Sequence, residues 1–168
     1  MAGWVALLRG INLGARNRIP MAGLRETFEV FGAEDVATYI ASGNVVFTHK
    51  RRAREALARD LQKAIAKDHG VDTPVVLRTF EEIREAAGRT PFGKDNAHTY
   101  ITFLAEPKKL PDLETGDDRM ELIGADLYLY LPNGLAKATL PLPKLDRAVG
   151  GTNRNFRTVT KLAEMTRG

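Results

Sequence analysis

Three arginines near the start of the chain, Arg9, Arg16 and Arg18, lie close enough in sequence to bind one anion together. They belong to a segment, 9–18, that contains no acidic residue and follows an apolar run. A guanidinium group can donate two parallel N–H groups to a phosphate or carboxylate, and the glycines and Asn12 allow backbone N–H groups to turn inward. The segment predicts an anion-binding loop. The alternative is a flexible basic loop whose glycines only permit a turn. The segment is neither a P-loop nor a dinucleotide-binding loop, because both glycine patterns are absent.

A second candidate site is the run Ser42-Gly43-Asn44, which lies between two apolar segments. A Gly-Asn pair in this context predicts a tight hairpin in which the glycine has a positive φ. The tip of such a hairpin would present the hydroxyl of Ser42 and the amide of Asn44 to a ligand. The alternative is that the pair serves the turn alone.

A third candidate site is a basic helix face near the C-terminus. Residues 155–165 are predicted to form a terminal helix capped by Asn153 or Asn155. Its spacing would place four polar residues on one face, where they could line a cleft. These residues are Arg154, Arg157, Thr158 and Lys161. The alternative is a solvated terminal helix.

The net charge of +4 is concentrated at the two ends of the chain. Residues 1–20 and 144–168 hold the whole positive excess, and the segment between them is slightly acidic. If the two ends meet in the fold, they form one electropositive surface that attracts anions; otherwise they are solvated basic surfaces. We expect five residues to face the ligand: Arg9, Asn12, Asn44, Arg154 and Arg157.

Several kinds of chemistry have no support in the sequence. There is no cysteine, which excludes disulfides, thiolate catalysis and Cys-based zinc sites. The histidines His49, His69 and His98 have no metal-ligand spacing, and we expect them at the surface or its boundary. Asp95 and His98 form a weak acid–base candidate. No metal, cofactor or nucleophile is predicted.

The expected location is the cytoplasm. The apolar run at the N-terminus is too short for a signal-peptide core, and no stretch of about 18 apolar residues exists to span a membrane. We therefore expect a soluble protein without membrane association.

The first half of the chain predicts a ferredoxin-like β-α-β-β-α-β order. Strand-type and helix-type apolar patterns alternate, and Pro20 and Gly32 mark the start and end of the first helix. The expected strands are 3–8, 36–41, 45–47 and 75–78, and the expected helices are 20–32 and 51–68.

The second half predicts a smaller, β-rich unit and a C-terminal helix, which makes the fold class α+β. A helix over 80–88 is expected to begin at Thr79, with Glu82 completing a capping box. Strands are expected at 100–104, 119–123 and 127–131, followed by a loop over 132–152 with a helical turn near 145–149. We expect a single compact domain, 1–168, with one sheet system, or two pseudo-repeated halves, about 1–79 and 80–168.

Three motifs together resemble those of the bacterial domain-of-unknown-function family 1697. They are Leu7–Gly14, Thr38–Phe47 and Arg154–Leu162. The third motif departs from the family pattern, which usually has Trp where Phe156 stands. The resemblance implies a small intracellular α+β protein and carries over no catalytic residue.

The function favoured by the residues is a binding module for a small anionic or nucleotide-like ligand. A nucleic-acid binder is an alternative, although only Trp4 and Phe47 are available for base stacking on the first sheet. A phosphate-handling hydrolase is another, with Arg16 or Arg18 clamping phosphate and Asn44 orienting water. A protein-interaction module is the last. No reaction is specified, and the oligomeric state is left open.

Overall fold

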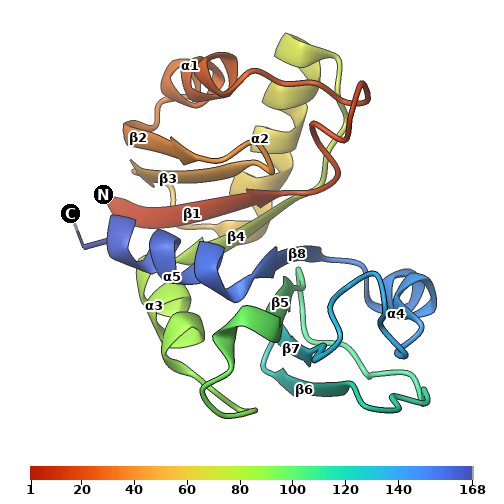
Figure 1. The fold of residues 1–168 in the computed structure, drawn as a ribbon. Helices are drawn as coiled ribbons and strands as arrows, with labels where there is room; N and C mark the ends of the chain where they lie inside the picture. The colour runs from red at the N-terminus through yellow and green to blue at the C-terminus, as the bar shows by residue number, and fades with distance from the viewer. Residues whose placement is uncertain (168) are drawn as a thin grey trace. The chain divides into compact units, whose positions relative to one another are not determined.

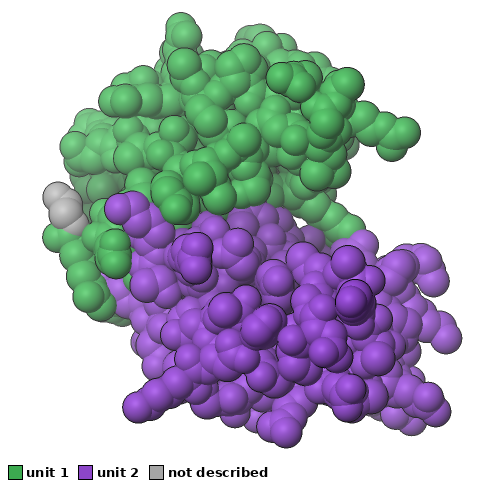
Figure 2. Space-filling model, in the orientation of Figure 1, with its two compact units in different colours: residues 1–83, 162–168 green, residues 84–161 purple. Residues whose placement is uncertain are grey.

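The computed structural model describes residues 1–167, which form two compact units (Figure 2). Unit 1 contains residues 1–83 and the chain from Leu162 onward, and unit 2 contains residues 84–161. The expected count of one domain stays a prediction. Within residues 1–167, no helix is both long enough and apolar enough to cross a membrane.

Unit 1 has the predicted β-α-β-β-α-β order. Its elements are β1 (Ala2–Leu8), α1 (Met21–Phe31), β2 (Glu34–Tyr39), β3 (Asn44–His49), α2 (Arg54–His69) and β4 (Val75–Thr79). The sheet order is β2-β3-β1-β4, and each pair of neighbouring strands is antiparallel. Figure 1 shows α1 and α2 on the same side of this sheet, as the ferredoxin-like plan requires.

β1 is buried on both faces, as its continuous apolar run predicts. Trp4, Ala6 and Leu8 belong to the core formed with the two helices. Val5 and Leu7 point to the opposite face because side chains alternate along a strand, and neither is exposed to solvent. The strand is thus enclosed on every side.

The two helices of unit 1 bury the stripes that the sequence pattern predicts. α1 buries Leu24 and Phe28, and the ring of Phe28 meets that of Phe47 edge-on at 5.1 Å. α2 buries a stripe at four-residue spacing, which consists of Leu57, Leu61 and Ile65. α1 ends at Gly32, whose φ of 108° is accessible to glycine without steric cost.

α2 begins at Arg54, three residues later than predicted. The carbonyl of Arg51 accepts a hydrogen bond from the indole Nε1–H of Trp4 at 3.2 Å, and the N–H of Arg51 is bonded to the His49 ring. Both backbone groups of Arg51 are therefore engaged outside a helix, and the chain turns into α2 only afterwards.

Unit 2 has a second antiparallel sheet, so the expectation of one sheet system is wrong. Its elements are β5 (Thr99–Phe103), β6 (Arg119–Ile123), β7 (Asp126–Tyr130), α4 (Leu142–Val149) and β8 (Thr152–Asn155), with a short 3-10 turn, η1 (Asn96–His98). The order β6-β7-β5-β8 repeats the order of the first sheet when strands are counted from the start of each unit. Residues 104–118 occupy the place of the first helix without forming one.

β8 is a strand that the sequence did not indicate, and it lies where the predicted loop over 132–152 meets the predicted cap of the terminal helix. β8 pairs with β5, with Tyr100 opposite Asn155 and Phe103 opposite Thr152. Its residues Thr-Asn-Arg-Asn have little intrinsic strand preference, so pairing with β5 decides the conformation. Arg154 consequently lies on a strand, and the predicted helix face that included it is wrong. The helix α5 (Phe156–Met165) begins after it.

Asn155 caps α5, which confirms one of the two expected caps. Its Oδ1 accepts the N–H of Thr158 at 2.8 Å. The helix α3 (Phe80–Gly88) has the predicted capping box as well. The N–H of Thr79 donates to Glu82 Oε1 at 2.8 Å, and the N–H of Glu82 donates to Thr79 Oγ1 at 3.1 Å.

The Glu82 carboxylate also binds Arg54 through two contacts, at 2.9 and 3.1 Å. Partial burial alone would raise the pKa of Glu82. The N–H of Thr79 and the guanidinium of Arg54 outweigh this effect, so the pKa lies below its ordinary value of 4.5. The ionised form of Glu82 therefore stabilises the folded state.

We predict that Glu82→Gln lowers the free energy of unfolding by about 1 kcal/mol at neutral pH, because a charge-assisted bond and an ion pair are lost at a half-exposed site. Since the folded pKa is lowered, this contribution exists above the unfolded pKa and disappears as pH falls through the folded value. Urea unfolding from pH 7 to 3 should show the two proteins converging. Glu81→Gln, in the same helical turn but exposed, is the control and should show no comparable convergence.

Candidate functional site

The loop after β1 is closed by the side chain of Asn12. Its Oδ1 accepts the N–H of Ile19 at 2.8 Å, and its Nδ2 donates to the carbonyls of Ile19 at 3.0 Å and Ala41 at 2.8 Å. Its backbone has a φ of 53°, a conformation that Asn tolerates better than most residues. One side chain thus joins both ends of the loop to the β2–β3 turn.

The tip of the loop is a small hairpin held by its own hydrogen bonds. Leu13 and Arg16 form an isolated antiparallel bridge across Gly14 and Ala15. Arg18 Nη1 donates to the carbonyl of Gly14 at 2.8 Å. The arginines at 16 and 18 are exposed. The loop has a defined conformation that presents these cations at the surface.

A hollow of about 390 Å³ lies where this loop meets the start of α1. Its lining residues are Asn12, Arg18, Ile19, Pro20, Met21 and Ala41. Pro20 precedes the helix, no side chain caps the first turn, and that turn contains no acidic residue. The first N–H groups of a helix have no partner within it and carry the positive end of its dipole, so this hollow favours an anion.

Two of the predicted ligand-facing residues in unit 1 do not line this hollow. Arg9 is half-buried, and its N–H and carbonyl both bond to Thr73 Oγ1, at 3.1 and 2.6 Å. Asn44 is fully buried as the first residue of β3, and its Nδ2 donates to the Tyr39 carbonyl at 2.8 Å and to Ser42 Oγ at 3.1 Å. The hairpin tip is therefore residues 40–43 and does not expose the Asn44 amide.

The other two predicted residues lie in unit 2 and differ in exposure. Arg154 is 6% exposed, and its Nη1 donates to Thr152 Oγ1 at 2.7 Å and to the Asn153 carbonyl at 2.9 Å. Burial lowers the pKa of Arg154 to about 10, which still leaves it charged at neutral pH. Arg157 is exposed on α5. A joint site formed by the two chain ends stays a prediction.

The Asp95–His98 pair suggested by the sequence is formed in unit 2. His98 Nδ1 lies 2.9 Å from Asp95 Oδ2, and the same oxygen accepts the hydroxyl of Tyr130 at 2.9 Å. The hydrogen bond with His98 and, to a smaller extent, the one from Tyr130 hold the pKa of Asp95 below its ordinary value. Tyr130 is far from the pair in sequence, so no local pattern could reveal it. The three residues hold the imidazole in a fixed orientation, and Asp95 is exposed to solvent.

The histidines are placed differently from one another. His69 is half-buried, and its Nε2 lies 2.9 Å from Thr27 Oγ1, which also donates to Asp68 Oδ2 at 2.8 Å. These contacts join α1 to α2. The hydroxyl of Thr27 is buried and hydrogen bonded, so it is not placed to act as a nucleophile. His49 is only 2% exposed, so its expected position at the surface or its boundary is wrong. As an inward-pointing residue at the end of β3, it is enclosed by neighbouring elements.

Comparison with known proteins gives a family and a fold. The family model described as "Protein of unknown function (DUF1697)" matches residues 1–128. The chain belongs to the DUF1697 family. The first two motifs that suggested this membership, Leu7–Gly14 and Thr38–Phe47, lie inside the matched range, and the third lies beyond it.

A solved structure has a similar fold. The conserved bacterial protein SP0830 from Streptococcus pneumoniae is similar over 100% of this chain and 99% of its own, with a TM-score of 0.80 and 24% sequence identity. At that identity the similarity establishes the fold alone. No curated protein matches the sequence.

We predict that Asn12→Asp destabilises the protein by about 1–3 kcal/mol, because both Nδ2 donations are lost and a carboxylate then faces two carbonyls. Asn17→Asp is the matched control. Asn17 also has a positive φ, of 51°, but makes a single exposed side-chain bond, to the Gly10 carbonyl at 3.0 Å. Urea unfolding midpoints at pH 7 measure both effects. Equal losses in the two variants would contradict the closing role of Asn12.

We predict that Tyr130→Phe raises the pKa of Asp95, because the carboxylate loses a hydrogen bond that favours its ionised form. Carbonyl-detected NMR titration of the Asp95 side chain measures the change directly. An unchanged titration midpoint would show that the hydroxyl does not interact with Asp95 in solution. Tyr100→Phe, in the same sheet, is the control.

Proposed function

We propose that unit 1 is a binding module for a small anionic ligand, such as the phosphate group of a nucleotide-like molecule. The site is the hollow at the start of α1. One observation carries the proposal: Arg18 lines a hollow at a helix N-terminus that has neither a cap nor an acidic residue. A guanidinium and a set of helix N–H groups are both suited to phosphate and carboxylate oxygens.

The surrounding charge supports the same ligand class. Segment 9–18 contributes Arg9, Arg16 and Arg18 without an opposing acid, and no residue that lines the hollow is acidic. A concentration of one sign of charge raises the local concentration of oppositely charged ligands and their association rate.

Asn12 has a positioning role in this proposal. Its three hydrogen bonds fix the loop before any ligand arrives, and a loop that is already ordered loses less conformational entropy on binding. Asn44 acts in the same way at the neighbouring turn, by holding residues 40–43. Arg9 adds charge to the loop. Arg154 and Arg157 keep their predicted role as ligand-facing residues, within unit 2. We place the binding activity in the cytoplasm.

Two alternatives receive less support. Base stacking on a ferredoxin-like sheet requires exposed aromatic rings, whereas Trp4 and Phe47 are buried in the core beneath the helices. A hydrolase in which Asn44 orients water would require its amide to reach the hollow. That amide is buried and bonded to Tyr39 and Ser42. Binding without chemistry is the function that the contacts favour.

We predict that phosphate-bearing or carboxylate-bearing molecules stabilise the wild-type protein and that Arg18→Ala abolishes this effect. A thermal-shift screen at low and moderate salt, with nucleotides, phosphates and carboxylated metabolites, makes the measurement. A ligand at 100 times its Kd contributes about 2.7 kcal/mol, which produces a clear shift.

The matched control is Arg25→Ala. Arg25 is an exposed cation on the same helix, and its Nε lies 3.7 Å from Glu29 Oε1, away from the hollow. The proposal requires Arg25→Ala to bind as the wild type does. It fails if no anion stabilises the protein, or if Arg18→Ala keeps the full shift.

A further inference from the structure

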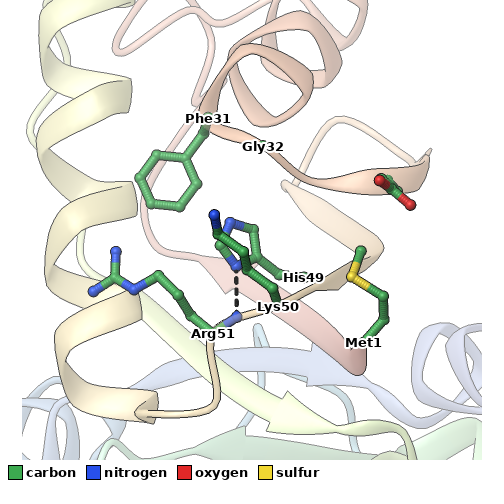
Figure 3. A pocket seen from close by; sticks show the side chains of 7 residues that line it. Met1, Phe31, Gly32, His49, Lys50 and Arg51 are labelled. Carbon is green, nitrogen blue, oxygen red and sulfur yellow. Dashed lines mark hydrogen bonds between the residues drawn. The ribbon is translucent and has the colours of Figure 1, made fainter.

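A second hollow, of about 380 Å³, lies at the opposite end of α1, within unit 1 (Figure 3). Its lining residues are Met1, Phe31, Gly32, Glu34, His49, Lys50 and Arg51. They come from the residue before β1, the end of α1, the first residue of β2, the end of β3 and the segment that leads to α2.

The ring of His49 is held in one orientation and one tautomer. Its Nδ1 accepts the backbone N–H of Arg51 at 3.0 Å, drawn as the dashed line in Figure 3, and its face packs against Phe31 with ring centroids 5.4 Å apart. Because Nδ1 accepts a hydrogen bond, the single proton of the neutral ring must lie on Nε2. His49 can therefore donate a hydrogen bond from Nε2 but cannot act there as a base or a metal ligand.

The Nε2–H donor belongs to a side chain that lines the hollow and is only 2% exposed. Across the part of the chain that the structure describes, Nε2 forms no hydrogen bond. A Cβ at position 32 would lie 3.4 Å from Nε2, so Gly32 leaves room in front of it. A polar group on a side chain as buried as His49 gains considerably from a hydrogen-bond acceptor.

The charges around the hollow have both signs. Arg51 is engaged with Asp60, with Nη2 2.9 Å from Oδ2. The side chains of Lys50 and Glu34 have no ion-pair or hydrogen-bond partner among residues 1–167, and both are exposed at the hollow. The side chains at the hollow thus offer one cation without an ion-pair partner in the described chain, Lys50, one such anion, Glu34, and the neutral donor of His49.

We propose that this hollow binds a small zwitterion of the amino-acid class. The carboxylate accepts the Nε2–H of His49 and pairs with Lys50, and the ammonium pairs with Glu34. Two further features fit this assignment. The last carbonyls of α1, next to Gly32, form the negative end of the helix dipole and favour the ammonium. The rings and methylene groups of Phe31 and Met1 offer apolar contact to a side chain. A dianion such as phosphate would be repelled by Glu34.

The test uses NMR of the full-length 15N-labelled protein, with long-range correlations from the His49 ring. Leucine, acetate and inorganic phosphate are the probes. We expect leucine to shift the Nε2 resonance in a saturable way, acetate to bind at least roughly tenfold more weakly, and phosphate to bind more weakly still. The proposal is overturned if leucine causes no saturable shift, or if acetate or phosphate binds as tightly as leucine.

Single substitutions test the proposed contacts of His49, Lys50 and Glu34 one at a time, with the affinity for leucine measured by calorimetry. His49→Asn places Oδ1 where Nδ1 lies, so it keeps an acceptor for the Arg51 N–H, while its shorter amide places no donor at the position of Nε2. His49→Asn and Lys50→Met should each weaken leucine binding by about tenfold or more. Lys63→Met, an exposed lysine on α2, is the control and should change nothing.

Glu34→Gln gives the sharpest result, and it does not depend on His49→Asn folding. Loss of the Glu34 charge should weaken leucine binding and strengthen acetate and phosphate binding, because the ammonium loses its partner and the anions lose a repulsion. The same change in affinity for all three probes would overturn the zwitterion assignment.

Discussion

The central position of β1 is the constraint on which the rest of unit 1 depends. The strand is hydrogen bonded to β3 on one edge and β4 on the other, and its side chains are buried on both faces. A strand enclosed in this way cannot shift by one residue without moving every side chain to the opposite face. Its register fixes where the chain leaves the sheet at Arg9, and so where loop 9–18 and the start of α1 must lie.

Loop 9–18 starts at a point fixed by β1, and the side chain of Asn12 constrains the loop further. The backbone of Arg9 is bonded to Thr73, and the Asn12 side chain bonds the far end of the loop and the β2–β3 turn. Two chain segments that are distant in sequence are thus tied to one short loop. Uncharged hydrogen bonds of Asn12 therefore position the exposed arginines of the loop. Charge alone could not predict which arginine lines the hollow, because these contacts decide it.

The sequence predicted what depends on local pattern and missed what depends on distant pairing. The helix stripes, the Gly32 stop and the Thr79–Glu82 capping box follow from spacings of a few residues, and the structure confirms them. β8 was missed because only its pairing with β5 makes it a strand. The burial of Asn44 and His49 was missed for the same reason, since enclosure comes from elements that no sequence window contains. Gly32 was correctly predicted to end a helix. The sequence could not show that its missing Cβ also leaves space beside the His49 ring.

Helix α1 connects the two hollows and accounts for their different chemistry. Its first turn lacks a cap and an acid, and the hollow there is lined by one cation, Arg18. Its last turn faces a hollow that holds Glu34 as well as Lys50. Because the helix dipole is positive at the start and negative at the end, each end reinforces the charge preference of the side chains around it. The two proposals therefore place different ligands at the two ends of a single 11-residue helix that packs on the sheet beside α2: a simple anion at its start and a molecule with both charges at its end.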